Sequence, residues 1–369
     1  MSFFNLLDLS NISVLHRAGF AFLTSLFLVL ILGNPYIKFV KLSKNFLQPI
    51  RDVLPEHQQK QGTPTMGGLL FMVVFWLSSF LWIVNLNNIV IIILLVSLGF
   101  TLLGFIDDAL KLAFKNHKGL PGKFRLFVGS VISLAAVYYL LQEYPPEIAK
   151  SIFFPFIHSF YMYVGVGILF FGAFVIVGTA NSVNLTDGLD GLASVVISTI
   201  LLTFMVLIVL IITPGVYTNF LYSAIFYFND IHEILIICAA LMGAILGFLW
   251  FNSFPAKIFM GDVGSLGIGG TLGIIAVSLK QELFLAVAGL FLVIESLSVI
   301  IQVYVFRLTR SEAKYGKDKN GNVQGKRIFL KTPIHHHFQL KGVAETAVVS
   351  RVWIFTIIMC VLALLLLDI

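Results

Sequence analysis

Ten long apolar runs dominate this chain of 369 residues, and they restrict the architectures that it can adopt. A helix needs about 20 apolar residues to cross a bilayer, because each residue advances it by only about 1.5 Å. We therefore predict an all-α polytopic membrane protein with about ten transmembrane helices. The runs lie near residues 19–40, 67–84, 88–106, 125–142, 160–179, 192–212, 234–251, 264–279, 284–306 and 350–367.

The composition supports this class of protein. Only 11% of the residues are charged, whereas a soluble domain has roughly a quarter, and the mean hydropathy is +0.98. A transmembrane β-barrel is excluded, because its strands would alternate polar and apolar residues. We expect residues 1–369 to form a single integral membrane domain. The chain has no clear internal repeat, which disfavours an inverted-repeat transporter.

The basic residues predict the orientation of the helices. They concentrate on one side of the predicted bundle, and Arg17, Lys150 and Lys280 are the exceptions on the other side. The positive-inside rule makes the basic side cytoplasmic and leaves both termini outside. The residues on the basic side are Lys38, Lys41, Lys44, Arg51, Lys60, Lys111, Lys115, Lys118, Lys123, Arg125, Lys257 and those from Arg307 to Arg351.

Two classes of chemistry are disfavoured by the sequence. Cys238 and Cys360 both lie within apolar runs, so we interpret them as core residues and expect neither a disulfide nor a thiolate metal site. The net charge of +6 is spread over several loops, and a nucleic-acid-binding protein would instead gather it on one face. We therefore expect no nucleic-acid partner.

Three carboxylates mark two of the predicted cytoplasmic helix ends. Asp107 and Asp108 end the third apolar run, and their side chains diverge by about 100° if that segment is helical. Asp262 begins a later run in the motif FMGDVGS, after Asn252. The alternative for each is a charged residue at the membrane interface. If the three carboxylates meet, they form the hard-oxygen ligand set that Mg²⁺ prefers, with Asp262 as a ligand.

The segment from 181 to 191, NSVNLTDGLDG, is the densest polar stretch of the chain. Asn181, Asn184, Asp187 and Asp190 provide two amides and two carboxylates, while Gly188 permits a tight turn or a close approach of a ligand. Such a loop is suited to sugar hydroxyls, a nucleobase edge or Mg²⁺. Its spacing does not match a calcium-binding EF-hand loop.

The last predicted cytoplasmic loop combines a turn with a histidine triplet. Asn320-Gly321 favours a tight turn, so we expect a short β-hairpin there, followed by His335, His336 and His337. Three consecutive histidines cannot readily converge on one ion, so contact with a diphosphate is favoured over zinc binding. Glu295 lies within a predicted span, and we interpret it as a structural hydrogen-bonding group rather than a catalytic one.

Together these groups fit phosphoryl transfer at a membrane surface. Mg²⁺ and lysines would neutralise a diphosphate, and a carboxylate would act as base or nucleophile. Lys60, Lys111 and Lys123 are candidate phosphate partners, although each is also explained by the positive-inside rule. One substrate could arrive from the lipid and the other from the cytosol.

The ordered motifs KQGTPTMGG, FIDD, NLTDGLDGL, FMGDVGSL and PIHHH resemble those of the phospho-N-acetylmuramoyl-pentapeptide transferases, within the polyprenyl-phosphate N-acetylhexosamine-1-phosphate transferase superfamily. The resemblance extends over nearly the whole chain. It implies a Mg²⁺-dependent enzyme of the bacterial plasma (inner) membrane that transfers phospho-MurNAc-pentapeptide from UDP to undecaprenyl phosphate. Lipid I and UMP would be the products, and a homodimer is common in the family.

The resemblance also implies roles for individual residues. Asp262 would bind Mg²⁺, and Asp107 and Asp108 would be the essential acidic pair, with His335 also in the catalytic set. The predicted uridine pocket contains Lys60, Gly188, Leu189, Asp190, Asn252 and Phe259, whose ring would stack on uracil. Asn181, Asn184, Asp187, His336 and His337 would lie near the diphosphate and sugar, with Lys111 and Lys123 nearby.

Alternatives remain open at this point. A sister enzyme that uses UDP-GlcNAc shares the aspartate motifs but not PIHHH. An ion-coupled transporter would place its carboxylates near the middle of the membrane, and a non-catalytic nucleotide- or lipid-binding protein would not need them for turnover. The chain also departs from many relatives at Arg51 to Pro55 and in a longer stretch from Ser311 to Gln324.

Overall fold

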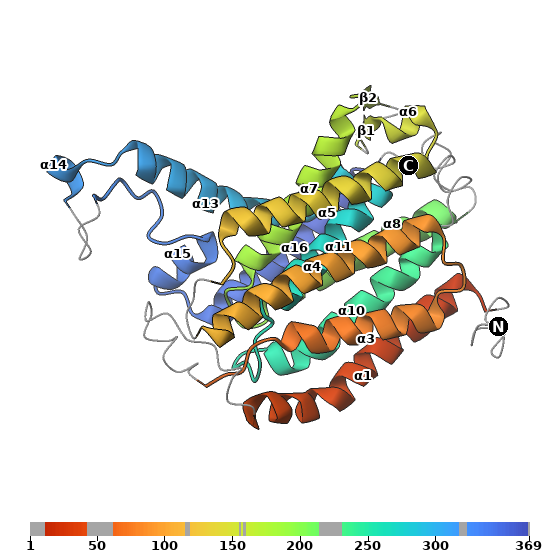
Figure 1. Ribbon diagram of the computed structural model, residues 1–369, viewed down its shortest axis with the longest axis horizontal. Helices are drawn as coiled ribbons and strands as arrows, with labels where there is room; N and C mark the ends of the chain where they lie inside the picture. The colour runs from red at the N-terminus through yellow and green to blue at the C-terminus, as the bar shows by residue number, and fades with distance from the viewer. Residues whose placement is uncertain are drawn as a thin grey trace.

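The regular structure in the described residues is almost entirely helical, as predicted. The computed structural model describes residues 12–42, 62–114, 119–154, 156–157, 160–213, 231–316 and 323–367. Its longer helices run side by side through one bundle (Figure 1). They are α1 (Val14–Leu42), α3 (Gly67–Trp82), α4 (Asn88–Ala113), α5 (Gly122–Leu140), α7 (Gly167–Thr186), α8 (Leu192–Ile212), α10 (His232–Asn252), α11 (Gly261–Ser278), α13 (Leu290–Leu308) and α16 (Glu345–Leu365).

Within the described residues, nine helices are long and apolar enough to cross a membrane. The remaining predicted span corresponds to α3, whose 16 residues are fewer than the roughly 20 that a perpendicular crossing needs. A second difference concerns the run at 284–306, which is divided into α12 (Glu282–Ala288) and α13 at Gly289. The expectation of about ten apolar helices is otherwise confirmed.

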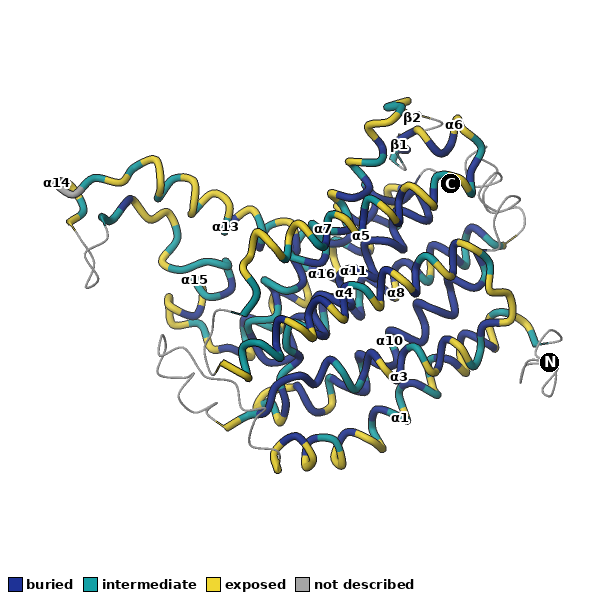
Figure 2. Tube along the Cα trace, in the orientation of Figure 1, coloured by how far each residue is buried: buried dark blue, intermediate teal, exposed yellow. Residues whose placement is uncertain are grey.

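Two central helices organise the core. In α11, 89% of the most apolar window is buried, and this helix packs against α4, α7 and α3. An added Cβ at Gly269 or Gly273 would lie within 2.8 Å of the α7 backbone, so the close packing predicted for this glycine-rich helix is confirmed. The second central helix, α10, packs against α1, α8 and α3. Figure 2 shows buried residues along both.

A buried ion pair lies at the end of the bundle opposite the polar motifs. Arg17 Nη1 lies 2.9 Å from Glu233 Oε1 and also donates a hydrogen bond to the Trp82 carbonyl oxygen. A buried charge needs such a partner, because an unpaired one would be strongly destabilising. Arg17, one of the few basic residues on the predicted outer side, is therefore accounted for by packing.

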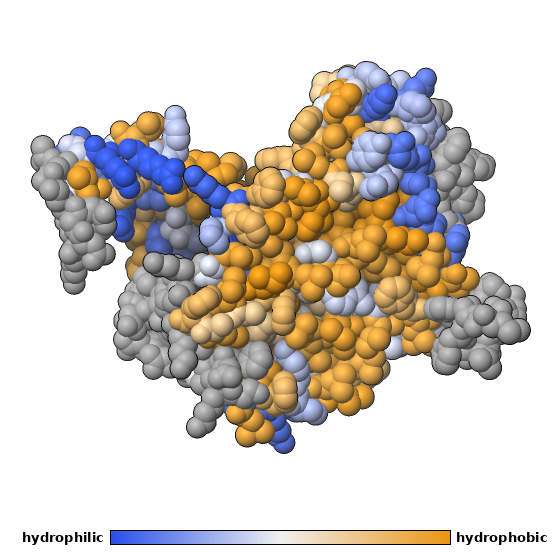
Figure 3. Space-filling view, viewed as in Figure 1, coloured by the Kyte–Doolittle hydropathy of each residue, from blue (hydrophilic) through white to orange (hydrophobic). Residues whose placement is uncertain are grey.

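The helix α13 behaves differently from the rest of the bundle. Only 22% of its most apolar window is buried, and its C-terminal half projects from the bundle together with α14 (Glu312–Tyr315) (Figure 1). The short helix α15 (Ile334–Leu340) follows on the same side. Apolar residues cover most of the visible face of the bundle, while hydrophilic residues follow the projecting arm (Figure 3).

The described strands lie in a different loop from the predicted hairpin. After η3 (Leu141–Glu143) and α6 (Pro146–Ala149), β1 (Ser151–Phe153) pairs antiparallel with β2 (Tyr161–Tyr163), with Ile152 opposite Met162. This ribbon lies between α5 and α7, at the predicted outer side. The Asn320-Gly321 turn lies outside the described residues. Beside it, the Ser311 and Gln324 backbones are joined by a 3.1 Å hydrogen bond.

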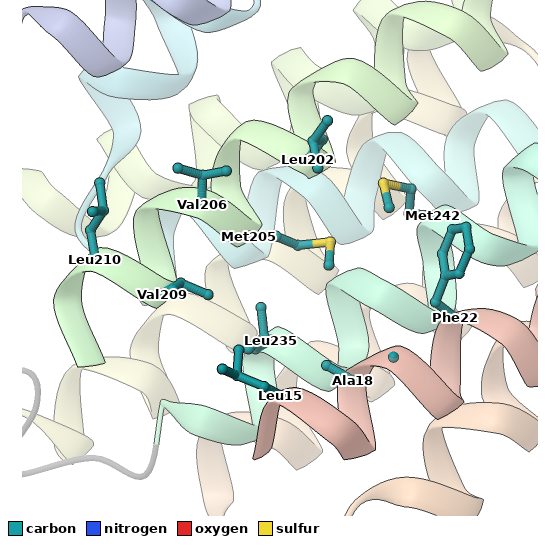
Figure 4. Close-up of a pocket in the computed structure, with 11 residues that line it drawn as sticks. Leu15, Ala18, Phe22, Leu202, Met205, Val206, Val209, Leu210, Leu235 and Met242 are labelled. Atoms are coloured by element: carbon teal, nitrogen blue, oxygen red, sulfur yellow. The ribbon is translucent and has the colours of Figure 1, made fainter. Parts of the chain in front are cut away.

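An apolar cavity of about 460 Å³ opens between α1, α8 and α10. Leu15, Phe22, Met205 and Met242 are among the side chains that face it (Figure 4). All of the lining residues are apolar or glycine, so the cavity contains no group suited to catalysis.

Candidate active site

The polar motifs meet where many helices begin or end. The helices α4, α7 and α10 end here, whereas α3, α5, α8, α11 and α16 begin here (Figure 1). The α1 helix begins and the α16 helix ends at the opposite end of the bundle, in agreement with the expectation that both termini share the other side. The site is therefore built at one end of the bundle rather than in its middle.

Three carboxylates form the centre of this site. Asp107 and Asp108 in α4 and Asp262 in α11 each offer an oxygen, and these oxygens all lie within 4.8 Å of one another. The approach depends on Gly104, since a Cβ there would lie only 2.1 Å from the Asp262 carbonyl oxygen. The predicted convergence of the aspartates is thus observed.

The two adjacent aspartates have different partners, as the helical geometry predicts. Asp107 Oδ1 accepts a 2.6 Å hydrogen bond from the Leu120 amide, which precedes α5. Asp108 Oδ2 accepts a 3.1 Å hydrogen bond from the Val263 amide in the first turn of α11. Both carboxylates are almost completely buried. Each therefore ties α4 to a different neighbouring helix.

Two cations face the three carboxylates. Lys111 Nζ lies 2.5 Å from Asp107 Oδ2, 3.0 Å from Asp262 Oδ2 and 3.4 Å from Asp108 Oδ1. Arg125 Nη1 lies 2.8 Å from Asp262 Oδ2 and 3.9 Å from Asp107 Oδ2. Three carboxylates and two cations leave one formal negative charge, which favours the binding of a further cation.

Arg125 was not among the residues predicted for the site, whereas Lys123 was. Lys123 is exposed, and none of its described contacts involves the aspartates. Both residues lie in the first turn of α5, where two positions along a helix differ by about 200° in direction. Only one of them can face the cluster. The sequence could identify Arg125 only through the direction in which position 125 points from α5. That direction can be predicted only if the start of the helix is known.

The two asparagines of the NLTDGLDG region have different surroundings. Asn184 Nδ2 donates hydrogen bonds to Asp262 Oδ1 and Ser265 Oγ, both at 2.9 Å, and thereby fixes the Asp262 carboxylate. Asn181 Nδ2 instead donates to the Val177 carbonyl oxygen. Its side chain lines an apolar cavity of about 860 Å³ between α5, α7, α12 and α13. Asn184 thus belongs to the cluster, and Asn181 belongs to the neighbouring cavity.

The turn from 187 to 191 is held by several segments. Asp190 Oδ2 accepts a hydrogen bond from the Ala256 amide at 2.9 Å, and the Asp190 amide donates to Glu345 Oε1 at 2.8 Å. The Gly191 amide donates to Asn252 Oδ1 at 3.1 Å. Asp190 and Asn252 are both buried. These residues position the turn, and Glu345 is a contributor that sequence reasoning missed.

Asp187 lies at the end of α7, outside the apolar span. The pKa of Asp187 is raised to about 8, mainly by burial and in addition by the negative charges of Asp262, Asp108 and Asp190. Deprotonated Asp187 is therefore disfavoured unless a cation approaches. A raised pKa next to a carboxylate cluster is characteristic of functional sites, although structural networks also produce one.

The His335 ring packs directly against the turn at Gly188. His335 Nδ1 lies 3.0 Å from Glu295 Oε1, and the other Glu295 oxygen accepts a hydrogen bond from the Ile334 amide. Both side chains are fully buried. A Cβ at Gly188 would lie 2.3 Å from His335 Nε2, so only glycine fits at this position. Glu295 therefore makes the hydrogen bonds expected of a structural group, and His335 contacts the turn.

The other two histidines point to different partners. His336 Nδ1 lies 2.8 Å from Gln339 Oε1, and His337 Nδ1 accepts a hydrogen bond from the Leu330 amide at 3.1 Å. Both rings are partly exposed. The three imidazoles therefore do not converge on one point, as predicted from their consecutive positions. The potential metal site found in the described part of the chain consists of aspartates.

The threonine motif joins the site through backbone pairing. The Phe259 amide donates to the Pro64 carbonyl oxygen at 2.8 Å, and the Gly67 and Gly68 amides donate to the carbonyl oxygens of Phe259 and Met260. The Phe259 side chain is partly exposed at the same end of the bundle, and Leu189 is buried beneath the turn. Lys60, predicted to contact uridine, lies outside the described residues.

The cluster can accommodate a divalent cation. Its donors are all carboxylate oxygens, and opposite ligands of one Mg²⁺ are separated by about 4 Å. The donor oxygens of the three aspartates all lie within 4.8 Å of one another, which is compatible with that separation. A cluster of carboxylate donors at one end of an apolar helical bundle could therefore hold a metal ion in a membrane-embedded enzyme.

Comparison with known proteins defines the family in two steps. The model of glycosyl transferase family 4 matches residues 90–280, so the chain belongs to this class of membrane transferase. Residues 60–72 also match phospho-N-acetylmuramoyl-pentapeptide-transferase signature 1. Within the class, the chain is a member of the phospho-N-acetylmuramoyl-pentapeptide-transferase family, as its long, closely similar relatives demonstrate.

Three relatives show the extent of the similarity. The phospho-N-acetylmuramoyl-pentapeptide-transferase of Pelagibacter ubique is 42% identical over 94% of this chain and 92% of its own length. Those of Thermodesulfovibrio yellowstonii and Ruegeria pomeroyi are 41% and 42% identical, over 95% and 94% of this chain and 92% of their own lengths. The resemblance inferred from the motifs is therefore confirmed over nearly the whole chain.

Proposed function

We propose that this protein transfers phospho-MurNAc-pentapeptide from UDP-MurNAc-pentapeptide to undecaprenyl phosphate, with lipid I and UMP as products. The observation that carries the proposal is the meeting of Asp107, Asp108 and Asp262 around Lys111 at one end of a membrane bundle. Membership of the family supports the same reaction. An ion-coupled transporter is disfavoured, because its carboxylates would be expected near the middle of the membrane.

The reaction exchanges one phosphorus–oxygen bond for another. An oxygen of undecaprenyl phosphate attacks the phosphorus that bears the sugar, and the bond from that phosphorus to the UMP oxygen breaks. We assign proton removal from the lipid phosphate to Asp107 or Asp108. Lys111 and Arg125, which already contact the carboxylates, would stabilise the negative charge on the diphosphate.

The carboxylates are suited to Mg²⁺, with Asp262 as the main ligand. When bound, Mg²⁺ would neutralise charge on the diphosphate and help to orient it. Asn184 holds Asp262 in place through its 2.9 Å hydrogen bond. Asp187, whose burial disfavours its charged form, would become ionised as positive charge enters the site.

We also propose roles for the other residues that were predicted for the site. Phe259 is partly exposed beside the threonine motif, which suits stacking on uracil. Asn252 and Asp190 would shape the same pocket by fixing the turn. We assign Lys60, Lys123, Leu189, His336 and His337 to contacts with the nucleotide, diphosphate or sugar. Asn181 is left out of this set, because its side chain lines the neighbouring apolar cavity. His335 would act by positioning Gly188.

We further propose that the protein resides in the bacterial plasma membrane with the site facing the cytoplasm and both termini outside. The excess of lysine and arginine at the site end of the bundle supports this orientation. A homodimer is proposed from the family resemblance, and size-exclusion chromatography with light scattering would test it.

The decisive experiment is a UMP-release assay with purified protein in detergent. We expect release that requires UDP-MurNAc-pentapeptide, undecaprenyl phosphate and Mg²⁺ together, and a loss of at least about 10²-fold in the Asp262→Asn variant. UMP release from UDP-GlcNAc instead would assign the sister activity. Substrate binding with unchanged turnover in Asp108→Asn and Asp262→Asn would indicate a non-catalytic binding protein.

A second measurement distinguishes the two chemical routes. Direct attack requires both substrates before any covalent change, whereas a phospho-aspartyl route modifies the enzyme first. UDP-MurNAc-pentapeptide labelled in the phosphate that bears the sugar should leave the protein unlabelled when the lipid is absent. A phospho-MurNAc-pentapeptide group on an aspartate, formed with release of UMP in the absence of undecaprenyl phosphate, would contradict direct attack.

A further inference from the structure

The projecting arm of α13 contains a small basic pocket that lies outside the aspartate cluster. The pocket has a volume of about 280 Å³. It is formed between the last turns of α13 and the returning segment that leads to α15 (Figure 1). Its lining residues are Gln302, Val303, Phe306, Arg307, Arg310, Arg327, Leu330, Lys331 and Thr332.

The two walls of this pocket are fixed to each other. Gln302 Oε1 accepts hydrogen bonds from the Ile328 and Phe329 amides, both at 3.0 Å. Thr309 Oγ1 accepts one from the Lys326 amide at 2.8 Å. A Cβ at Gly325 would lie 2.1 Å from the Phe306 carbonyl oxygen, so the two backbones are in direct contact. The pocket is thus a built feature of the arm.

Four cationic side chains line this small space. Arg307 and Arg310 come from the end of α13, and Arg327 and Lys331 come from the returning segment. Within the described residues, Arg307, Arg310 and Arg327 form no ion pair with a carboxylate, and the Arg310 guanidinium lies over the Phe306 ring at 5.6 Å. Like charges repel one another, so their gathering favours an anionic ligand.

The surroundings of the pocket are apolar. Tyr304, Leu308, Ile328 and Leu330 are all exposed next to the cations. The α13 helix is apolar enough to cross a membrane, and Arg307 lies in its last turn. The pocket is therefore at the level where a membrane helix ends and lipid headgroups begin. Hydrophilic residues adjoin apolar ones along this arm in Figure 3.

We propose that this pocket binds the headgroup phosphate of an anionic phospholipid in the membrane leaflet on the site side of the bundle. The guanidinium groups would form paired hydrogen bonds with the phosphate oxygens, and the exposed apolar side chains would contact the acyl chains. This assignment adds a site to the enzyme and does not depend on the reaction proposed above.

Native mass spectrometry of the full-length protein in detergent tests this assignment. Titration with phosphatidylglycerol should give more bound lipid than titration with zwitterionic phosphatidylcholine. The triple variant Arg307→Gln, Arg310→Gln, Arg327→Gln should bind phosphatidylglycerol about tenfold more weakly, because each cation near an anionic headgroup contributes to binding. Replacement of the same three residues by lysine should restore a substantial part of the affinity.

A matched control removes three other exposed cations from the same side of the bundle. Lys38, Lys41 and Arg351 are exposed and do not line the pocket. Their replacement by glutamine causes the same change in charge and should leave phosphatidylglycerol binding within about twofold of the wild type. An equal loss in this control would contradict a localised site.

Three further results would overturn the proposal. The first is equal binding of phosphatidylglycerol and phosphatidylcholine by the wild-type protein. Displacement of phosphatidylglycerol by millimolar inorganic phosphate would indicate a site for free phosphate instead of a lipid. A raised KM for UDP-MurNAc-pentapeptide in the triple glutamine variant, with lipid binding unchanged, would assign the pocket to the nucleotide substrate.

Discussion

Each carboxylate of the site is defined by the residues that contact it. Asp262 accepts one hydrogen bond from Asn184 and contacts both Lys111 and Arg125, whereas Asp108 is fixed by a backbone amide. Asp262 is also the most accessible of the three aspartates. These contacts explain why Asp262 is suited to a bound cation, while Asp107 and Asp108 are held in place by α5 and α11.

Arg125 should be required for efficient turnover. Its guanidinium is 2.8 Å from Asp262 and would be next to the diphosphate. We expect Arg125→Ala to lower the rate of UMP release by about 10²-fold, the usual effect of removing one charge-stabilising group. Arg125→Lys, which retains the charge but not the planar donor pair, should recover part of it. An unchanged rate for Arg125→Ala would remove this residue from the site.

Asp187 should reduce stability at high pH. Its pKa is near 3.8 in the unfolded chain and about 8 in the folded protein, so the folded state holds the proton more tightly. Stability is therefore lost as pH rises from about 4 to 8. In protein free of metal and substrate, Asp187→Asn should raise Tm by a few degrees at pH 8.5 and by less at pH 5.5. A gain that is the same at both pH values would contradict the raised pKa.

Among the elements, the contact of α4 with α11 decides the geometry of the site. The two helices carry all three aspartates, and Gly104 allows their backbones to touch. The turn between α7 and α8 is fixed in a similar way, since the Glu295–His335 pair connects α13 to α15 directly below Gly188. Close helix packing thus places the polar groups of the site.

Gly104→Ala should separate the aspartates. The added methyl group would lie 2.1 Å from the Asp262 carbonyl oxygen, so α4 must move away from α11. We expect a loss of stability of about 1–3 kcal/mol in detergent, together with a large fall in UMP release. In the same helix, a Cβ at Gly99 meets only the Ile132 side chain, at 3.3 Å. Gly99→Ala is therefore the matched control, and an equal effect of both substitutions would refute this account.

At the scale of the whole molecule, the two ends of the membrane bundle carry different structural features. The site-bearing helix ends share one side of the bundle, and the Arg17–Glu233 pair and the β1–β2 ribbon share the other. On the site side, the α13 arm projects beyond the rest of the bundle (Figure 1). The proposed reaction needs this arrangement, because one substrate is a lipid and the other is a soluble nucleotide.

The proposed orientation can be measured by labelling with an impermeant thiol reagent. Cys238 and Cys360 are both buried, so the wild-type protein should remain almost unlabelled in intact cells. The variant Lys150→Cys lies on the outer side and should be labelled without permeabilisation. Lys341→Cys, at the exposed end of α15, should be labelled only after the membrane is opened. The reverse pattern would invert the topology.

The sequence alone determined the elements and the reaction class. Apolar runs identify membrane helices because burial in lipid is a property of each segment and needs no partner. The aspartate, glycine and histidine motifs indicated a metal–phosphate site, and basic residues suggested its side of the membrane. Each of these features is contained in one short segment of the chain, so it can be recognised without knowing the tertiary structure.

Only the tertiary structure decided which side chains meet. It directed Arg125 rather than Lys123 toward the aspartates, placed Asn181 in the apolar cavity, and buried His335 beneath Gly188. It also located a strand pair between α5 and α7, where no hairpin was expected. Such outcomes depend on helical phase and on backbone contacts between segments far apart in the chain, and a linear pattern of residue types does not specify either one.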